Sequence, residues 1–209
     1  EYNVKGTYYF RIVKSSYDYN IIKKISDLGH EVGYHYEDID LVIKNRINSN
    51  DFNEIIDKSY ESFCDNLSFF RESFDIHTIC MHGSPMSKYD NKLIWKKYDY
   101  KELSILGEPY FDVNFKKVFY ITDTGRMWDG YKYSIRDKID DLQSTWEENG
   151  YKYHSTNDVI NAIDRCEFPS KAMFTVHPQR WNNNVVFWLK EILIQKIKNI
   201  IKRIIIIIK

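Results

Sequence analysis

Cysteine is scarce in this sequence, and several sequence motifs of well-known enzyme classes are absent. The three cysteines, Cys64, Cys80 and Cys166, are odd in number and far apart, with no Cys-x-x-Cys pair. This pattern disfavours a disulfide framework and fits a reducing compartment. The sequence also lacks Gly-x-Gly-x-x-Gly, a Gly-Lys-Ser/Thr loop and a Gly-x-Ser-x-Gly elbow. These absences disfavour nucleotide-phosphate binding and serine hydrolysis of the corresponding kinds.

Excess charge of either sign is also missing, because 30 basic residues balance 30 acidic ones. The net charge of zero therefore gives no overall electrostatic attraction to nucleic acid or to an acidic partner. The sequence opens without a signal-peptide pattern, which predicts a cytoplasmic or membrane-peripheral protein. Because the chain begins at Glu1 and enters a strand-like run almost at once, we also expect further residues before it.

Aromatic residues are abundant, with 17 Tyr, 12 Phe and 5 Trp. They can build a core, and Tyr and Trp also line sugar and nucleobase sites. The first aromatic run, Val4–Val13, predicts a buried parallel strand. Apolar residues at three- and four-residue spacing then predict a helix over 18–28, which Gly29 ends. A short strand over 31–35 completes a predicted β-α-β unit.

The same alternation continues along the chain. Strands are predicted over 76–81, 118–122 and 172–176, and helices over 52–70, over 156–163 and from Val185 onward. Strands that alternate with helices indicate a parallel α/β sheet or barrel. We expect residues 1–185 to form that domain and residues 186–209 to form a separate C-terminal helix.

Polar residues follow the predicted strands at the points where they end. His35, His82, Asp123 and His177 each follow a different strand. Because the carboxyl ends of parallel strands meet on one face, we expect these side chains on one rim. Three imidazoles and a carboxylate there would suit a divalent metal, zinc first among them. The alternative, common for a single histidine, is a structural role.

Arginine and tryptophan side chains follow the later two strand ends. Arg126, Trp128, Arg180 and Trp181 are candidates for substrate binding, because Trp stacks on sugars and Arg binds carboxylates or phosphates. The alternative is an aromatic–guanidinium stack that orders a loop.

The C-terminal segment is basic and amphipathic. Lysines and one arginine alternate with isoleucines, and the sequence is too interrupted by charge to span a bilayer. The first interpretation is a final helix that covers the barrel with its apolar face. The second is a helix that contacts an anionic membrane from one side.

Two of these stretches carry a resemblance to a known family. The segment Leu28-Gly29-His30-Glu31-Val32-Gly33-Tyr34-His35 resembles a signature of the polysaccharide deacetylases, the NodB-homology group of carbohydrate esterases. Val4-Lys5-Gly6-Thr7-Tyr8-Tyr9-Phe10 is similar to that family's second barrel strand. The resemblance implies a distorted (β/α) barrel that binds a divalent metal. It also implies an enzyme that removes acetyl groups from N-acetylated saccharides, with cell-envelope polysaccharide metabolism as one setting.

The resemblance implies roles for individual residues. His35 stands at a metal-ligand position, and His177 stands where the family has its general acid. Asp123 and Trp128 are loosely similar to the family's fourth motif. The position of a second metal histidine holds Ile39, so we hypothesise that His82, in Met81-His82-Gly83-Ser84-Pro85, supplies that imidazole.

The family's first motif, an Asp-Asp pair that supplies the base and a metal ligand, is not in this sequence. The barrel strand that carries it is therefore expected upstream of Glu1 or missing from the protein. Two alternatives stay open: a catalytically inactive barrel that binds glycan or a protein partner, and a metal-dependent hydrolase of another amide or ester.

Overall fold

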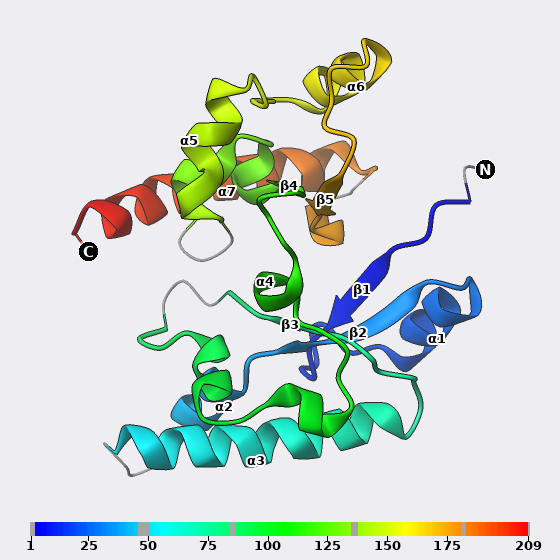
Figure 1. Cartoon of the computed structure of the whole chain (residues 1–209), viewed down its shortest axis with the longest axis vertical. Helices are drawn as coiled ribbons and strands as arrows, with labels where there is room; N and C mark the ends of the chain where they lie inside the picture. Colours follow the sequence, from blue (N-terminus) through cyan, green and yellow to red (C-terminus); the bar gives the residue numbers. More distant parts are fainter. Residues whose placement is uncertain (1–2, 46–50, 84–86, 135–137, 181–182, 209) are drawn as a thin grey trace. The chain divides into compact units, whose positions relative to one another are not determined.

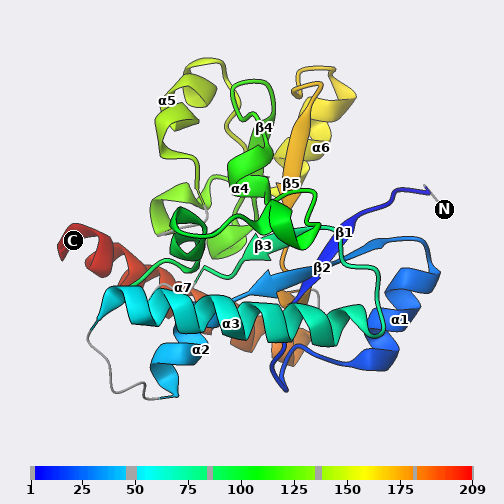
Figure 2. The same cartoon turned by 60° about the horizontal axis from the view of Figure 1, so that its bottom comes forward.

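The chain is a mixed α/β protein with two small parallel sheets (Figures 1 and 2). The computed structural model describes residues 3–45, 51–83, 87–134, 138–180 and 183–208. They divide into two compact units, Glu1–Val113 and Asn114–Lys209, which are described separately below. The boundary at Val113 lies within the region that the sequence assigned to one barrel. Closure of the strands into a barrel stays a prediction.

The first unit contains a three-stranded sheet in the order β1-β2-β3. Its elements are β1 (Thr7–Phe10), α1 (Tyr19–Asp27), β2 (Glu31–Tyr36), α2 (Asp38–Lys44), α3 (Phe52–Arg71), β3 (Ile79–Met81), η1 (Asn91–Lys96), η2 (Tyr100–Leu103) and α4 (Pro109–Asp112). The second unit contains β4 (Phe119–Thr122), η3 (Thr124–Arg126), η4 (Gly130–Tyr133), α5 (Asp140–Glu148), α6 (Thr156–Asp164), β5 (Ala172–Thr175), η5 (Pro178–Arg180) and α7 (Val185–Ile208).

The predicted β-α-β unit at the start of the chain is confirmed. The carboxylate of Asp18 accepts a hydrogen bond from the Ile21 backbone N–H at 3.1 Å and so caps α1. Gly29 ends the helix with φ of +77°, a conformation that side chains with a Cβ rarely adopt. β1 and β2 then pair in parallel. β1 is shorter than the predicted strand because Val13 already accepts backbone bonds in a turn, and the prediction that the strand is buried is wrong, since none of its residues is buried.

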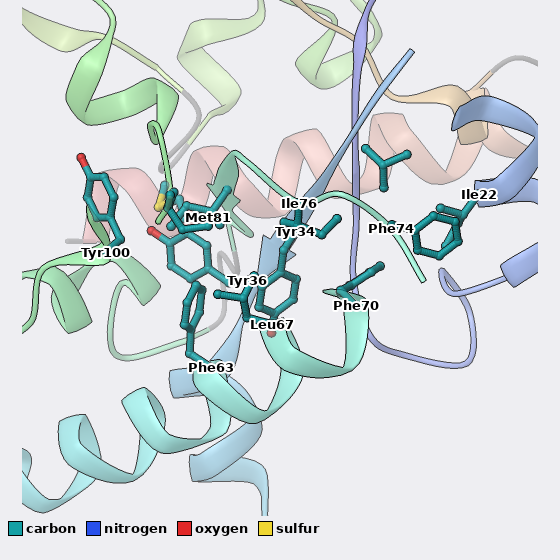
Figure 3. Close-up of a cluster of buried hydrophobic side chains, with 13 residues drawn as sticks. Ile22, Tyr34, Tyr36, Phe63, Leu67, Phe70, Phe74, Ile76, Met81 and Tyr100 are labelled. Atoms are coloured by element: carbon teal, nitrogen blue, oxygen red, sulfur yellow. The ribbon is translucent and has the colours of Figure 1, made fainter. Parts of the chain in front are cut away.

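The core of the first unit forms between α3 and the central strand β2. Phe63, Leu67 and Phe70 lie on one face of α3, where the apolar spacing predicted them, and all are buried. Figure 3 shows these side chains pointing toward Tyr34 and Tyr36 of β2. The ring of Phe63 lies 5.3 Å from that of Tyr34 and 5.7 Å from that of Tyr36. This packing fixes β2, and with it the segment that follows.

Helix α2 was not predicted from the sequence. Its acidic start, Glu37-Asp38, is buried rather than exposed in a loop. Ile39, at the position where the resemblance would place a second metal histidine, is fully buried in an apolar cluster. The other buried members of that cluster are Val42, Ile55, Ile56 and Ile94. The position therefore has a packing role in this chain.

The second unit is built on the parallel pair β4 and β5. Every residue of β4 is buried, and Phe119 contacts the rings of Trp146 and Phe168. The predicted helix over 156–163 is confirmed, and Ser155 caps it in a reciprocal arrangement with Asp158. Helix α5 was not predicted. Helix α7 begins at Val185, as predicted, and contacts η3 and η4.

Candidate functional site

Two histidines of the first unit meet at the ends of neighbouring strands. β2 and β3 pair in parallel with His35 opposite Cys80, and His82 follows the end of β3. The two rings are nearly perpendicular, with centroids 5.0 Å apart. Nε2 of His35 lies 3.2 Å from Nδ1 of His82. The sequence prediction that these two imidazoles come together is confirmed.

The orientation of His35 is set by its other ring nitrogen. Nδ1 lies 2.8 Å from the backbone carbonyl oxygen of Cys80. Because a carbonyl oxygen only accepts hydrogen bonds, the ring proton of His35 resides on Nδ1. Nε2, the nitrogen that faces His82, is then the one that could accept a hydrogen bond or bind a cation. Metal-binding histidines are commonly oriented by such a bond to a carbonyl or carboxylate.

His82 lies beside a buried carboxylate. Oε2 of Glu37 is 3.8 Å from Nε2 of His82 and has no hydrogen-bond partner in the described part of the chain. The other oxygen, Oε1, accepts bonds from Arg11 at 2.9 Å and 2.7 Å. Burial, helped by His35 and Arg11, lowers the pKa of His82 to about 3. His82 is therefore a neutral imidazole at neutral pH.

A residue that sequence reasoning missed holds this arrangement in place. Asn91 is fully buried, and its side chain donates to the backbone carbonyl of His82 at 3.0 Å. Its carbonyl oxygen accepts from the backbone N–H of Ile39 at 3.1 Å. Asn91 thus links the loop that carries His82 to the start of α2. Arg11 and Glu37 were also missed as a pair, since no local motif joins residues so far apart in the chain.

The geometry of the His35–His82 pair fits a shared metal ion. Two nitrogens bound to one tetrahedral zinc at about 2.0–2.1 Å would be about 3.3 Å apart. The observed 3.2 Å matches that separation. For His82 to bind through Nδ1, its proton must be on Nε2, which faces the unpartnered oxygen of Glu37. A carboxylate, a histidine and a metal are commonly arranged in this way. Within the described residues, no group of three His, Cys, Asp or Glu side chains is placed to bind a metal.

The second unit contains a different imidazole site. The side chain of Asp123, after β4, accepts hydrogen bonds from Nδ1 of His177 and, at 3.1 Å, from the His177 backbone N–H. Arg180 lies 2.9 Å from the same carboxylate. Burial alone would raise the pKa of Asp123, but the bonds from His177 and the charge of Arg180 outweigh it and lower the pKa. This pairing directs Nδ1 of His177 toward Asp123.

The remaining candidates have structural partners. Arg126 forms an ion pair with Glu191 of α7 and lies 5.6 Å from the ring of Trp188. The indole N–H of Trp128 donates to Thr156 at 3.1 Å. The cavity beside Trp128 measures about 20 Å³, which is space for a water rather than a sugar. These contacts favour the loop-ordering alternative for both residues, and their substrate roles stay predictions. Trp181 lies outside the described residues, as do Ser84 and Pro85 of the His82 motif.

No protein-family model, curated protein or solved structure matches this chain. The resemblance to polysaccharide deacetylases therefore rests on the quoted motifs. A single rim that joins His35 and His82 with Asp123 and His177 stays a prediction.

Proposed function

We propose that this chain is a metal-dependent hydrolase of N-acetylated saccharides, similar to the polysaccharide deacetylases that its motifs resemble. The observation that supports it is the separation of 3.2 Å between Nε2 of His35 and Nδ1 of His82. The bond from His35 to the Cys80 carbonyl orients the first of these nitrogens for a cation. Neutral imidazoles suit zinc and other first-row metals.

In this proposal the candidate residues have different roles. His35 and His82 would hold the cation, and the N–H that His82 would then have on Nε2 would face Oε2 of Glu37. A bound divalent cation supplies Lewis-acid polarisation of an amide carbonyl and lowers the pKa of water. As the resemblance implies, His177 would act as general acid toward the leaving amine, with Asp123 orienting its ring.

A second candidate is a deacetylase-like protein without catalysis that binds glycan or a protein partner. The observation that favours it is the number of protein ligands, since the described residues place two imidazoles together but no third metal-binding side chain. A catalytic zinc site usually has three protein ligands and one open position.

Metal titration of the full chain tests the site. We expect zinc and cobalt to bind, and His35→Ala or His82→Ala to weaken binding by about a hundredfold or more, since even the loss of an orienting partner costs 10–100-fold. His77→Ala is the matched control, because His77 is an exposed histidine of the same unit that pairs with Asp75. Equal metal content in the wild type and His35→Ala would contradict the proposal.

Acetate release from N-acetylated chito-oligosaccharides tests the reaction. We expect release to depend on added metal and to fall in His177→Ala, whereas the zinc affinity of that variant stays at the wild-type value. Oligosaccharide binding without release would support the second candidate instead. Release from other amides or esters but not from the oligosaccharides would identify a different substrate class.

A further inference from the structure

Helix α7 presents its polar residues to its own unit and its apolar residues to the outside. Gln195 and Asn199 are both 7% exposed. Asn199 accepts a bond from Gln195 at 2.7 Å and donates to the backbone carbonyl of Gly125 at 3.0 Å. Eight exposed apolar residues lie on the opposite side of the helix, namely Val186, Leu189, Leu193, Ile194, Ile197, Ile200, Ile201 and Ile204. This is the reverse of an ordinary surface helix.

The borders of the apolar side are basic. At about 100° per residue, these eight side chains span an arc of about 140°, which also contains Lys190, whereas the exposed Val185, Phe187 and Trp188 of the first turn lie outside it. Lys196 and Arg203 lie at one border of this arc and Lys198 at the other. The helix has a single acidic residue, Glu191, which is already paired with Arg126. The side of α7 that faces away from its own unit is therefore a mainly apolar strip with cationic edges, and Lys190 lies within it.

We propose that α7 docks in the plane of an anionic phospholipid bilayer. An apolar strip with lysine and arginine at its edges is the pattern of a helix that lies at a membrane surface. The long basic side chains extend from the edges to the phosphates while the isoleucines enter the acyl boundary. No helix in the described part of the chain is long and apolar enough to cross a membrane.

The basic edges favour a bilayer over a second copy of the chain as the occupant. Protein–protein interfaces are depleted of lysine, and two identical cationic strips would repel each other. An anionic bilayer instead neutralises the edges that it covers. The charge of α7 thus complements a lipid surface and opposes pairing with itself.

Sedimentation of the full chain with vesicles tests the proposal. We expect binding to phosphatidylcholine vesicles that contain phosphatidylglycerol, weaker binding as salt increases, and little binding to phosphatidylcholine alone. The double variant Ile197→Asp, Ile200→Asp is expected to lose binding, whereas Ile160→Asp, an exposed isoleucine of α6, keeps it. Lys196→Glu with Arg203→Glu is expected to weaken binding by at least about tenfold.

Several outcomes would overturn the proposal. Failure of the wild type to sediment with the anionic vesicles is one, and equal loss of binding by Ile160→Asp is another. Light scattering that shows a dimer, dispersed by Ile197→Asp, would make the strip an interface between copies. A large fall in thermal stability of Ile197→Asp without vesicles would mean that the rest of the chain covers the strip.

Discussion

The two units distribute apolar and polar residues in opposite ways. In the first unit, α3 presents Phe63 and Phe70 to the central strand, and both are fully buried (Figure 3). In the second unit, α7 buries Gln195 and Asn199 and exposes its isoleucines. Hydrophobic burial therefore explains the position of α3, whereas hydrogen bonds and an ion pair hold α7. The number of apolar residues in a helix therefore does not by itself fix which side is buried, since α7 is richer in apolar residues than α3 and exposes many of them.

The imidazole sites of the two units also differ. In the first unit, Nε2 of His35 and Nδ1 of His82 lie 3.2 Å apart beside a buried carboxylate, a separation that would suit a shared cation. In the second unit, His177 is tied to Asp123, which suits proton transfer. In both sites Nδ1 of the histidine faces an oxygen, and the difference lies in the partner, which is a backbone carbonyl for His35 and a carboxylate for His177.

The largest expected effect comes from removing an apolar side chain from α3 and, for comparison, from α7. Phe63→Ala leaves a cavity in a closed core, and we expect it to lower the free energy of unfolding by about 3–5 kcal/mol. Leu193→Ala, on the exposed side of α7, is expected to change it by less than about 0.5 kcal/mol. Urea denaturation of the full chain measures both. A cost above about 2 kcal/mol for Leu193→Ala would show that the strip of α7 is covered in solution.

The second test uses pH, because the pKa values of buried carboxyl groups are raised in the first unit and lowered in the second. Burial raises the pKa of Asp38 to about 6 and that of Glu108 to about 7. Each of these two groups favours the folded state when it is protonated. Their contribution to the free energy of unfolding is therefore fully present below about pH 4 and is lost as the pH rises through 6 to 7. The pKa of Asp123 is lowered, so its contribution is present above about pH 4 and is lost as the pH falls through its lower folded pKa.

Unfolding of single variants across this range separates the two effects. Asp38 contributes up to about 3 kcal/mol of the pH dependence, from the difference between 3.8 and about 6. Asp38→Asn retains the shape of a side chain that bonds to Tyr34, Ser62 and Asn66, and we expect it to flatten the fall in stability between pH 4 and 7. Asp123→Asn is the control, which should leave that fall unchanged. The same slope in Asp38→Asn as in the wild type would refute the assignment.

The smallest expected effect comes from a glycine of β2. A Cβ on Gly33 would lie 2.5 Å from the ring of Tyr9 and 2.9 Å from the backbone oxygen of Thr78. Because that oxygen belongs to the backbone that leads into β3, Gly33→Ala should cost about 1–3 kcal/mol and weaken zinc binding at His35. Gly6→Ala, whose Cβ would have 3.8 Å to its nearest neighbour, is the control. Equal unfolding midpoints for the two variants would show that the sheet adjusts freely.

The local structure near the start of the chain was determined by the sequence. Asp18 and Gly29 mark the two ends of α1, and the apolar spacing of α3 predicted which of its faces is buried. The position of His35 and His82 at the ends of successive strands also predicted their contact, because parallel pairing places strand ends together. These features depend on capping, on helix periodicity and on strand direction, all of which are encoded in short segments.

Other features depend on tertiary structure alone. The ring nitrogen that bears the proton in His35 is set by a carbonyl 45 residues away in the chain, and the role of Glu37 depends on Arg11 and His82. The sequence showed that α7 is amphipathic and basic, but either side could have faced the protein. The tertiary structure shows which side does: Asn199 donates a buried hydrogen bond to the Gly125 carbonyl, and Glu191 pairs with Arg126.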